Sequence, residues 1–162
     1  MWWALDVHYQ DEACVVAGVG FSDFTTAWGS EAVLTVPGPP APYEPGQFYR
    51  RELPLLERFL AGREVRGVVV DGYVWLAQDR PGLGAHLRTV MPDIDVIGVA
   101  KTGFRGSDDV AVPVLRGEST RPLWVTAEGV DLTQAATWIR RMHGEFRMPT
   151  LLKRVDALCR NG

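Results

Sequence analysis

The first fifth of the chain shows the alternation of apolar and polar positions that is typical of β-strands. Residues 2–9 alternate and are rich in aromatic and β-branched side chains, which predicts a strand with Asp6 at its middle. The polar residues 10–12 predict a turn, and residues 13–21 predict a second strand that pairs with the first as a hairpin. A third strand is expected at 31–36. Because a lone aspartate in a buried strand is costly unless paired or metal-bound, Asp6 is a candidate functional residue.

A second and stronger strand pattern is Arg66-Gly-Val-Val-Val-Asp71-Gly72. Three consecutive β-branched residues between Gly67 and Asp71-Gly72 predict a short strand that is buried on both faces. A carboxylate at the carboxyl end of such a strand, followed by a glycine, is a recurrent way to build an active site on an α/β sheet. Taken alone, Asp71 is equally compatible with an aspartate that merely starts a turn.

The second half of the chain continues with alternating helices and strands. Pro81-Gly82-Leu-Gly84 predicts a helix start packed close to the sheet, and residues 95–100 predict a buried strand that ends in Lys101. Residues 103–120 are polar and glycine-rich and predict a loop or a small hairpin, and 122–126 predict the last strand. A lysine at a strand's carboxyl end, facing the same cleft as Asp71, is suited to holding a phosphate as a point charge.

Three further segments show the apolar spacing of helices. The first begins near residue 47, and Pro54 inside it predicts either a kink or a helix that starts near the proline. Glu52 lies where its apolar stripe begins, and spacing alone does not distinguish it from a solvated surface glutamate. Asp131 is the expected cap of a second helix that ends near residue 142. Pro149 opens a final helix that carries Asp156 among its apolar residues.

Between the early strands and the first helix lies a stiff, proline-rich loop over residues 37–46 that can be neither helix nor central strand. It carries Tyr43. Such a loop is compatible with a plain linker, and equally with a rigid wedge whose aromatic side chain inserts where a base has been unstacked. Early antiparallel strands followed by alternating helices and strands predict an α/β fold with a mixed central sheet flanked by helices. Its length predicts that the whole chain, 1–162, is one domain.

Composition narrows the class of protein. An apolar content of 46% with 23% charged residues is that of an ordinary soluble globular protein. The net charge of −3 argues against a protein that coats nucleic acid by charge alone, but not against a nuclease whose carboxylates bind a metal. The two cysteines, Cys14 and Cys159, lack metal-ligand spacing and favour a reduced intracellular setting over a disulfide scaffold. With neither an apolar run of membrane-spanning length nor a signal peptide, we expect a cytoplasmic protein without a membrane partner. The sequence does not indicate an oligomeric state.

Five segments together resemble the endonuclease V family and occur in the family's order across nearly the whole chain. They are Ala4-Leu-Asp6-Val-His-Tyr9, Pro42-Tyr-Glu-Pro-Gly-Gln-Phe-Tyr-Arg-Arg-Glu-Leu-Pro54, Val69-Val-Asp71-Gly72, Ile97-Gly-Val-Ala-Lys101, and Arg147-Met-Pro149 leading to Asp156. The tyrosine-proline-glycine segment with its downstream glutamate and the Gly-Val-Ala-Lys segment are specific to the family, whereas the Val-Asp-Gly triplet is common.

The resemblance implies a ribonuclease-H-like fold and an endonuclease that depends on Mg²⁺, for which Mn²⁺ can substitute. Family members recognise inosine in DNA or RNA and cut the second phosphodiester on its 3′ side. By position, the resemblance assigns the catalytic roles to Asp6, Glu52, Asp71, Lys101 and Asp156, with Asp6 and Asp71 as the metal-binding pair. It assigns the nucleic-acid contacts to Tyr43 as the strand-separating wedge and to Phe48, Gly72 and the residue at Val74 as the walls of the base pocket.

The residue types suit this chemistry without the analogy. Hydrolysis of a phosphodiester needs a hard cation to polarise the phosphoryl oxygens, and carboxylates with waters are the ligands that Mg²⁺ prefers. Several carboxylates gathered around one phosphate would repel it if no metal were present. A lysine then offsets the negative charge that grows in the transition state.

The sequence also departs from the family. Val74 stands where a second glycine is usual, Ala77-Gln78-Asp79 replaces a histidine-proline-arginine cluster, and Glu128-Gly129 replaces a glycine-histidine pair. The chain is also short, without an amino-terminal helix and an insertion between Lys101 and Pro122. Two alternatives therefore stand beside an inosine endonuclease acting in nucleic-acid repair or processing: a relative that selects another lesion or structure, and a nucleic-acid-binding protein that hydrolyses nothing.

Overall fold

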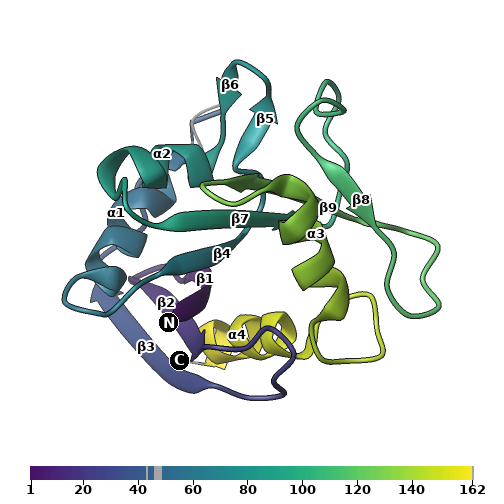
Figure 1. The fold of residues 1–162 in the computed structure, drawn as a ribbon. Coiled ribbons are helices and arrows are strands. Elements are labelled where there is room, and N and C mark those ends of the chain that lie inside the picture. Colours follow the sequence, from purple (N-terminus) through teal and green to yellow (C-terminus); the bar gives the residue numbers. More distant parts are fainter. Residues whose placement is uncertain (43, 46–48, 162) are drawn as a thin grey trace.

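The computed structural model describes residues 1–42, 44–45 and 49–161. Within these residues the fold is a central sheet of seven strands with helices on both faces and a separate two-stranded hairpin (Figure 1). The strands are β1 (Trp2–Tyr9), β2 (Ala13–Phe21), β3 (Ser30–Pro37), β4 (Gly67–Asp71), β7 (Asp95–Ala100), β8 (Val112–Val114) and β9 (Leu123–Glu128) in the sheet, and β5 (Trp75–Ala77) with β6 (Arg80–Pro81) in the hairpin.

The sheet is mixed, and its order across the fold is β3-β2-β1-β4-β7-β9-β8. The early strands β1, β2 and β3 form an antiparallel meander. At the centre of the sheet, β1 runs parallel to β4, and β4 runs parallel to β7. The strands β9 and β8 then continue antiparallel to the far edge. The predicted α/β class with a mixed central sheet flanked by helices is therefore confirmed.

Helices cover the two faces of the sheet in pairs: α1 (Tyr49–Leu60) and α2 (Leu83–Val90) on one face, α3 (Leu132–Arg141) and α4 (Thr150–Asn161) on the other. Because side chains alternate between the two faces along β1, this strand contributes residues to the hydrophobic core on each face of the sheet. Trp2 and Ala4 pack in the core beneath α3 and α4, and Trp3 and Leu5 pack in the core beneath α1 and α2. By the same alternation, Asp6 points toward α4.

The local patterns placed most elements correctly. The strands at 2–9, 13–21 and 95–100 have the predicted bounds, and the side chain of Asp131 caps α3 by accepting a hydrogen bond from Gln134 N–H at 3.1 Å. A Cβ atom at Gly84 would lie 2.8 Å from Val74 Cγ2, so the glycine lets α2 pack closely on the sheet as expected. The helix α1 begins five residues before Pro54, which excludes a start at the proline.

Two features were not predicted from the sequence. One is the β5–β6 hairpin, whose strands have only three and two residues and are too short to show alternation. The other is β8, a three-residue edge strand that contains Pro113, a residue that β-patterns exclude from central strands. Within the described part of the chain, no helix combines the length and the apolarity needed to cross a membrane.

Candidate functional site

Three of the predicted site residues lie on or directly after the three central parallel strands: Asp6 inside β1, Asp71 at the carboxyl end of β4, and Lys101 directly after β7. In the sheet, Ala4 of β1 is paired with Val69 of β4, and Asp6 and Asp71 each follow two residues later. Asp71 in turn is paired with Val99 of β7, and Lys101 follows two residues after that. Because side chains on a strand alternate between faces, these positions share the face that α4 covers.

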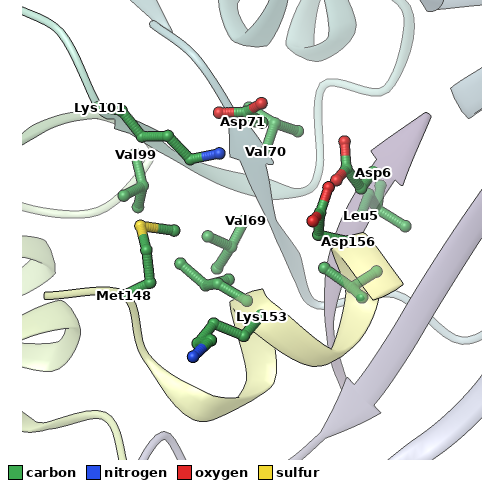
Figure 2. A pocket seen from close by; sticks show the side chains of 12 residues that line it. Leu5, Asp6, Val69, Val70, Asp71, Val99, Lys101, Met148, Lys153 and Asp156 are labelled. Carbon is green, nitrogen blue, oxygen red and sulfur yellow. The ribbon is translucent and has the colours of Figure 1, made fainter. Parts of the chain in front are cut away.

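A pocket of about 220 Å³ opens at this place between the strand ends and α4. Figure 2 shows the carboxylates of Asp6 and Asp156 close together on one side of it and Asp71 on the other, with the amine of Lys101 reaching toward Asp71. The floor is apolar and is formed from the strands and from α4, by Leu5, Val69, Val70, Val99, Met148, Leu152 and Val155. The structure thus brings together Asp6, Asp71, Lys101 and Asp156.

Asp6 and Asp156 form a coupled pair. Burial raises the pKa of the Asp6 carboxyl to about 6, and the charges of Asp71 and Asp156 contribute to this rise, while the hydrogen bond from Val7 N–H to Asp6 Oδ1 at 2.9 Å opposes it. Burial would also raise the pKa of Asp156, but hydrogen bonds with Arg160 and Asp6 hold it below its usual range. The negative charge of Asp156 therefore makes ionisation of Asp6 costly when no cation is bound.

Glu52 approaches the same cluster from the opposite face of the sheet. Its side chain is 8% exposed, which excludes the solvated position on the helix surface that its spacing had left open. Burial, together with the negative charges of Asp6 and Asp71, raises the pKa of Glu52 to about 8. A buried acid that is repelled by two other acids contributes little to stability, so its position favours a functional role.

Asp71 and Lys101 face each other across the mouth of the pocket. Burial raises the pKa of Asp71, the positive charge of Lys101 lowers it, and the charge of Asp156 raises it again. The net direction is upward, so one lysine does not neutralise the cluster. Oxygen ligands on separate strands and helices, with an excess of negative charge, fit a hard divalent cation such as Mg²⁺.

A second pocket, of about 320 Å³, adjoins Asp71 and Gly72 on the other side. Aromatic side chains dominate its lining, namely Tyr49, Tyr73 and Phe104, and the guanidinium of Arg80 lies 5.3 Å from the centre of the Phe104 ring. Gly72 has a φ of +113° and nothing within 4 Å of where a Cβ would be, so its backbone is exposed to this space. The sequence interpretation found Gly72 but missed the aromatic residues, which come from segments about 30 residues apart.

The structure does not place the side chain of Val74 in this pocket. The side chain is fully buried against Gly84 in the core beneath α2, and the backbone N–H of Val74 donates to Thr126 Oγ1 at 2.8 Å. An effect of Val74 on base selectivity stays a prediction, and it would have to act through the backbone. Tyr43 and Phe48, the other two expected nucleic-acid contacts, lie outside the described residues.

The departures from the family pattern fall on two surface features. Gln78 and Asp79 form the turn of the β5–β6 hairpin, directly after Ala77. Glu128 ends β9, where it accepts hydrogen bonds from Trp75 Nε1 at 2.8 Å and from Arg88 Nη1 at 3.1 Å. Glu128 therefore connects the end of β9 to the hairpin and to α2 by hydrogen bonds within the protein.

Two arginines that the sequence interpretation missed anchor the segment that leads into α4. Arg116 is 5% exposed and donates to five backbone carbonyls between residues 140 and 147. Arg147 donates to the carbonyls of Lys101, Arg121 and Pro122. Because Arg147 binds the backbone of Lys101 itself, the entry to α4 and the end of β7 are fixed to each other.

Comparison with known proteins gives this geometry a context. A family model described as Endonuclease V matches residues 3–157. Among curated protein sequences there is no match.

Solved structures of the same description match over nearly the whole chain. An endonuclease V from Streptomyces avermitilis is 26% identical with a TM-score of 0.79, over 98% of this chain and 79% of that one. The catalytic domain of human endonuclease V is 21% identical with a TM-score of 0.75, over 99% of this chain and 80% of that one. A Ciona intestinalis endonuclease V, in complex with DNA containing an inosine followed by a ribo-adenosine, is 20% identical with a TM-score of 0.74, over 99% of this chain and 84% of that one.

Proposed function

The chain belongs to the endonuclease V family, and on this premise we propose that it is a metal-dependent endonuclease that hydrolyses a phosphodiester bond near inosine in DNA or RNA. We propose that residues 1–162 act as a single nuclease domain in nucleic-acid repair or processing in the cytoplasm. The observation that carries the proposal is the cluster of Asp6, Asp71 and Asp156 around one pocket with Lys101 at its mouth, which Glu52 approaches from the opposite face of the sheet.

Asp6 and Asp71 are the proposed ligands of Mg²⁺, with Mn²⁺ as a substitute. When bound, the cation polarises the phosphoryl oxygens and activates the attacking water. The pKa of Asp6 and that of Asp71 are both raised by burial, so a cation that favours their ionised forms relieves an existing electrostatic cost. Glu52 and Asp156 complete the anionic surroundings of the ion from α1 and α4.

Lys101 acts on the phosphate. Its amine reaches toward Asp71 from the end of β7 and offsets the negative charge that develops on the scissile phosphate. Arg147 holds the backbone of Lys101 in place, and the apolar floor of the pocket excludes water from the side opposite the mouth.

The aromatic pocket beside Gly72 is the proposed position of an extruded base. A flipped base is held by stacking on aromatic rings and by hydrogen bonds to its edge, and Tyr49, Tyr73 and Phe104 offer the rings. Gly72 leaves backbone groups accessible at the border between this pocket and Asp71. Tyr43 and Phe48 remain the proposed wedge and an additional apolar wall.

The test is cleavage of matched strands. The folded protein is incubated with Mg²⁺ and with DNA and RNA strands that carry inosine or adenosine at one position, and the products are mapped to the nucleotide. We expect Mg²⁺-dependent cleavage on the 3′ side of inosine. Absence of cleavage of every strand, by protein whose melting temperature responds to Mg²⁺, would favour a binding protein that hydrolyses nothing.

A second candidate, an endonuclease of altered base or structure selectivity, is favoured by the hydrogen bond from Val74 N–H to Thr126 Oγ1, which occupies a backbone donor next to the proposed base pocket. Val74→Gly, which removes the branched side chain and loosens the backbone that holds this donor, should then sharpen the preference for inosine over adenosine by about ten- to a hundredfold, equivalent to about 1–3 kcal/mol. The ratio of the two cleavage rates measures this. Strong inosine selectivity in the wild type, unchanged by the glycine, would show that other residues read the base.

A further inference from the structure

The thiol of Cys159 lies against the acidic cluster, although the two cysteines of the chain lack the spacing of a metal site. Asp156 and Cys159 are one helical turn apart on the buried face of α4, and Cys159 is 1% exposed. Its Sγ atom and one carboxylate oxygen each of Asp6 and Asp156 all lie within 4.8 Å of one another. The site therefore offers sulfur in addition to oxygen.

We propose that Asp6, Asp156 and Cys159 form a binding site for a thiophilic divalent cation, of the class of Zn²⁺ and Cd²⁺. The inference deepens the proposed function and rests on it through Asp6, the residue that both cations would share. Both carboxylates line the pocket, which gives an ion a path from solvent, and the buried thiol lies one turn of α4 beyond Asp156.

The distances suit such an ion after small movements. A tetrahedral ion with a metal–sulfur distance of about 2.3 Å and metal–oxygen distances of about 2.1 Å holds its ligand atoms about 3.6 Å apart. The three ligand atoms need to draw together by an ångström or so at most, within the reach of ordinary side-chain rotation about the Cα–Cβ bonds. Cys159 packs in the core beneath α3 and α4, and its thiol donates to the carbonyl of Asp156 at 3.2 Å, one turn back along α4.

The ligand preferences of Zn²⁺ and Cd²⁺ differ from that of Mg²⁺. Mg²⁺ prefers oxygen ligands and gains nothing from a thiol, whereas Zn²⁺ and Cd²⁺ bind thiolate sulfur strongly. On binding, the sulfur–metal bond forms as the thiol proton leaves to solvent, and nothing is oxidised or reduced. Since Asp6 cannot serve both ions fully, a thiophilic cation displaces Mg²⁺ from the cluster.

The experiment is a titration of the metal-free protein with Cd²⁺, followed by the ultraviolet charge-transfer absorption of a cadmium–thiolate bond, with Mg²⁺ affinity measured in parallel by calorimetry. The variants are Cys159→Ser and Cys159→Ala, and the matched control is Cys14→Ser. Cys14 is also a buried cysteine, but it lies on β2 outside the group of ligands. Expressing the result as the ratio of Cd²⁺ to Mg²⁺ affinity removes effects of a partly unfolded sample.

We expect the absorption band in the wild type and in Cys14→Ser and its loss in both Cys159 variants. The affinity ratio should fall by at least roughly tenfold, the smallest cost of losing even an outer partner of a metal ligand. A wild type without the band, a band that persists in Cys159→Ser, or a band lost in Cys14→Ser overturns the proposal.

The same titration keeps this proposal distinct from the proposed function. Protein that cleaves inosine-containing strands with Mg²⁺ but shows no thiolate band overturns the cysteine site and leaves the nuclease standing. Protein that shows the band but cleaves no strand supports the cysteine site and overturns the nuclease.

Discussion

Glu128, which ends β9, and the acids Asp6 of β1 and Asp71 of β4 belong to one sheet but lie in opposite electrostatic surroundings. Glu128 on β9 is matched by an indole N–H and a guanidinium, both within hydrogen-bond distance. Asp6 and Asp71 face further acids, and burial raises the pKa of each. A carboxylate that serves the fold is paired, whereas a cluster kept at a cost to the fold has another use, which here is the proposed cation site.

The largest expected effect comes from removing one acid of the unpaired cluster. Asp71→Ala should reduce cleavage by roughly a thousandfold or more, because the charge stabilisation that a bound cation supplies is worth several kcal/mol. In the absence of metal the same change should leave the melting temperature unchanged or raise it, since it relieves repulsion among the carboxylates. The cleavage rate and the melting temperature, measured on the same sample, check the expected loss of activity and the expected effect on stability.

Asp71→Asn controls for lost volume in that experiment. Unchanged turnover in either variant would contradict the assignment of Asp71 as a metal ligand. A large fall in melting temperature would contradict the contrast with Glu128.

Lys101→Ala should lower the catalytic rate by roughly 10²–10³-fold, the usual cost of losing one group that stabilises transition-state charge. The melting temperature should change little, because Lys101 lies at the exposed mouth of the pocket. Lys153→Ala is the matched comparison: Lys153 lines the same pocket, but Figure 2 shows its amine directed away from the carboxylates. Lys153→Ala should therefore lower the catalytic rate less than Lys101→Ala does. A normal rate in folded Lys101→Ala, with a large fall in melting temperature, would point to a structural ion pair.

The pH dependence of stability should reveal the cluster without any substrate. The folded-state pKa values of Asp6, about 6, and Glu52, about 8, lie above their usual 3.8 and 4.5. For an acid with a raised pKa, the stabilising contribution is full below the unfolded-state pKa and is lost as pH rises through the folded-state pKa. The metal-free protein should therefore lose stability, on the order of a few kcal/mol, between about pH 4 and pH 8.

Melting curves across this range with a chelator, and again with Mg²⁺, provide the measurement. Mg²⁺ should flatten or reverse the loss of stability with rising pH. Glu52→Gln should remove the part of this loss that occurs at the higher pH values, where Glu52 titrates. A melting temperature that rises steadily to pH 8 without metal would show that the acids are paired like Glu128.

The smallest effect is expected at Glu128 itself. Glu128→Gln should lower the free energy of unfolding by about 1 kcal/mol or less, the range for a half-exposed ion pair with one charge-assisted hydrogen bond. Its response of melting temperature to Mg²⁺ should match that of the wild type. If Glu128→Gln instead gained stability, as Asp71→Ala can in the absence of metal, the proposed distinction between the paired Glu128 and the acid Asp71 would be wrong.

Much of the fold and part of the site follow from local sequence pattern. Asp6, Asp71 and Lys101 could be expected to meet because the carboxyl ends of neighbouring parallel strands lie at one edge of a sheet. The expectation of a ribonuclease-H-like topology, and the roles proposed for Glu52 and Asp156, came from the resemblance to the family. Periodicity shows which face of a helix is apolar, but it does not show which element will cover it.

The remainder of the site depends on contacts between distant segments. The burial of Glu52 results from how α1 docks on the sheet, and the aromatic pocket joins Tyr73 to Phe104 across about 30 residues. Val74 looked like a pocket residue because it follows Gly72, yet its side chain turns into the core. Cys159 could have been found earlier: its spacing of three from Asp156, on an apolar helix face, is a pattern that a search limited to cysteine pairs overlooks.

The packing of α4 on β1 and β2 has a consequence for how the chain is made. Asp6 and Asp156 are 150 positions apart (156 − 6), so a ribosome that adds roughly 5–20 residues per second finishes the helix about 8–30 s after the first strand. During that interval the apolar face of the early meander has no cover, and it is the natural binding surface for a chaperone. Asp156 joins Asp6 and Asp71 only when α4 arrives, so the growing chain has no complete acidic cluster until synthesis has passed Asp156.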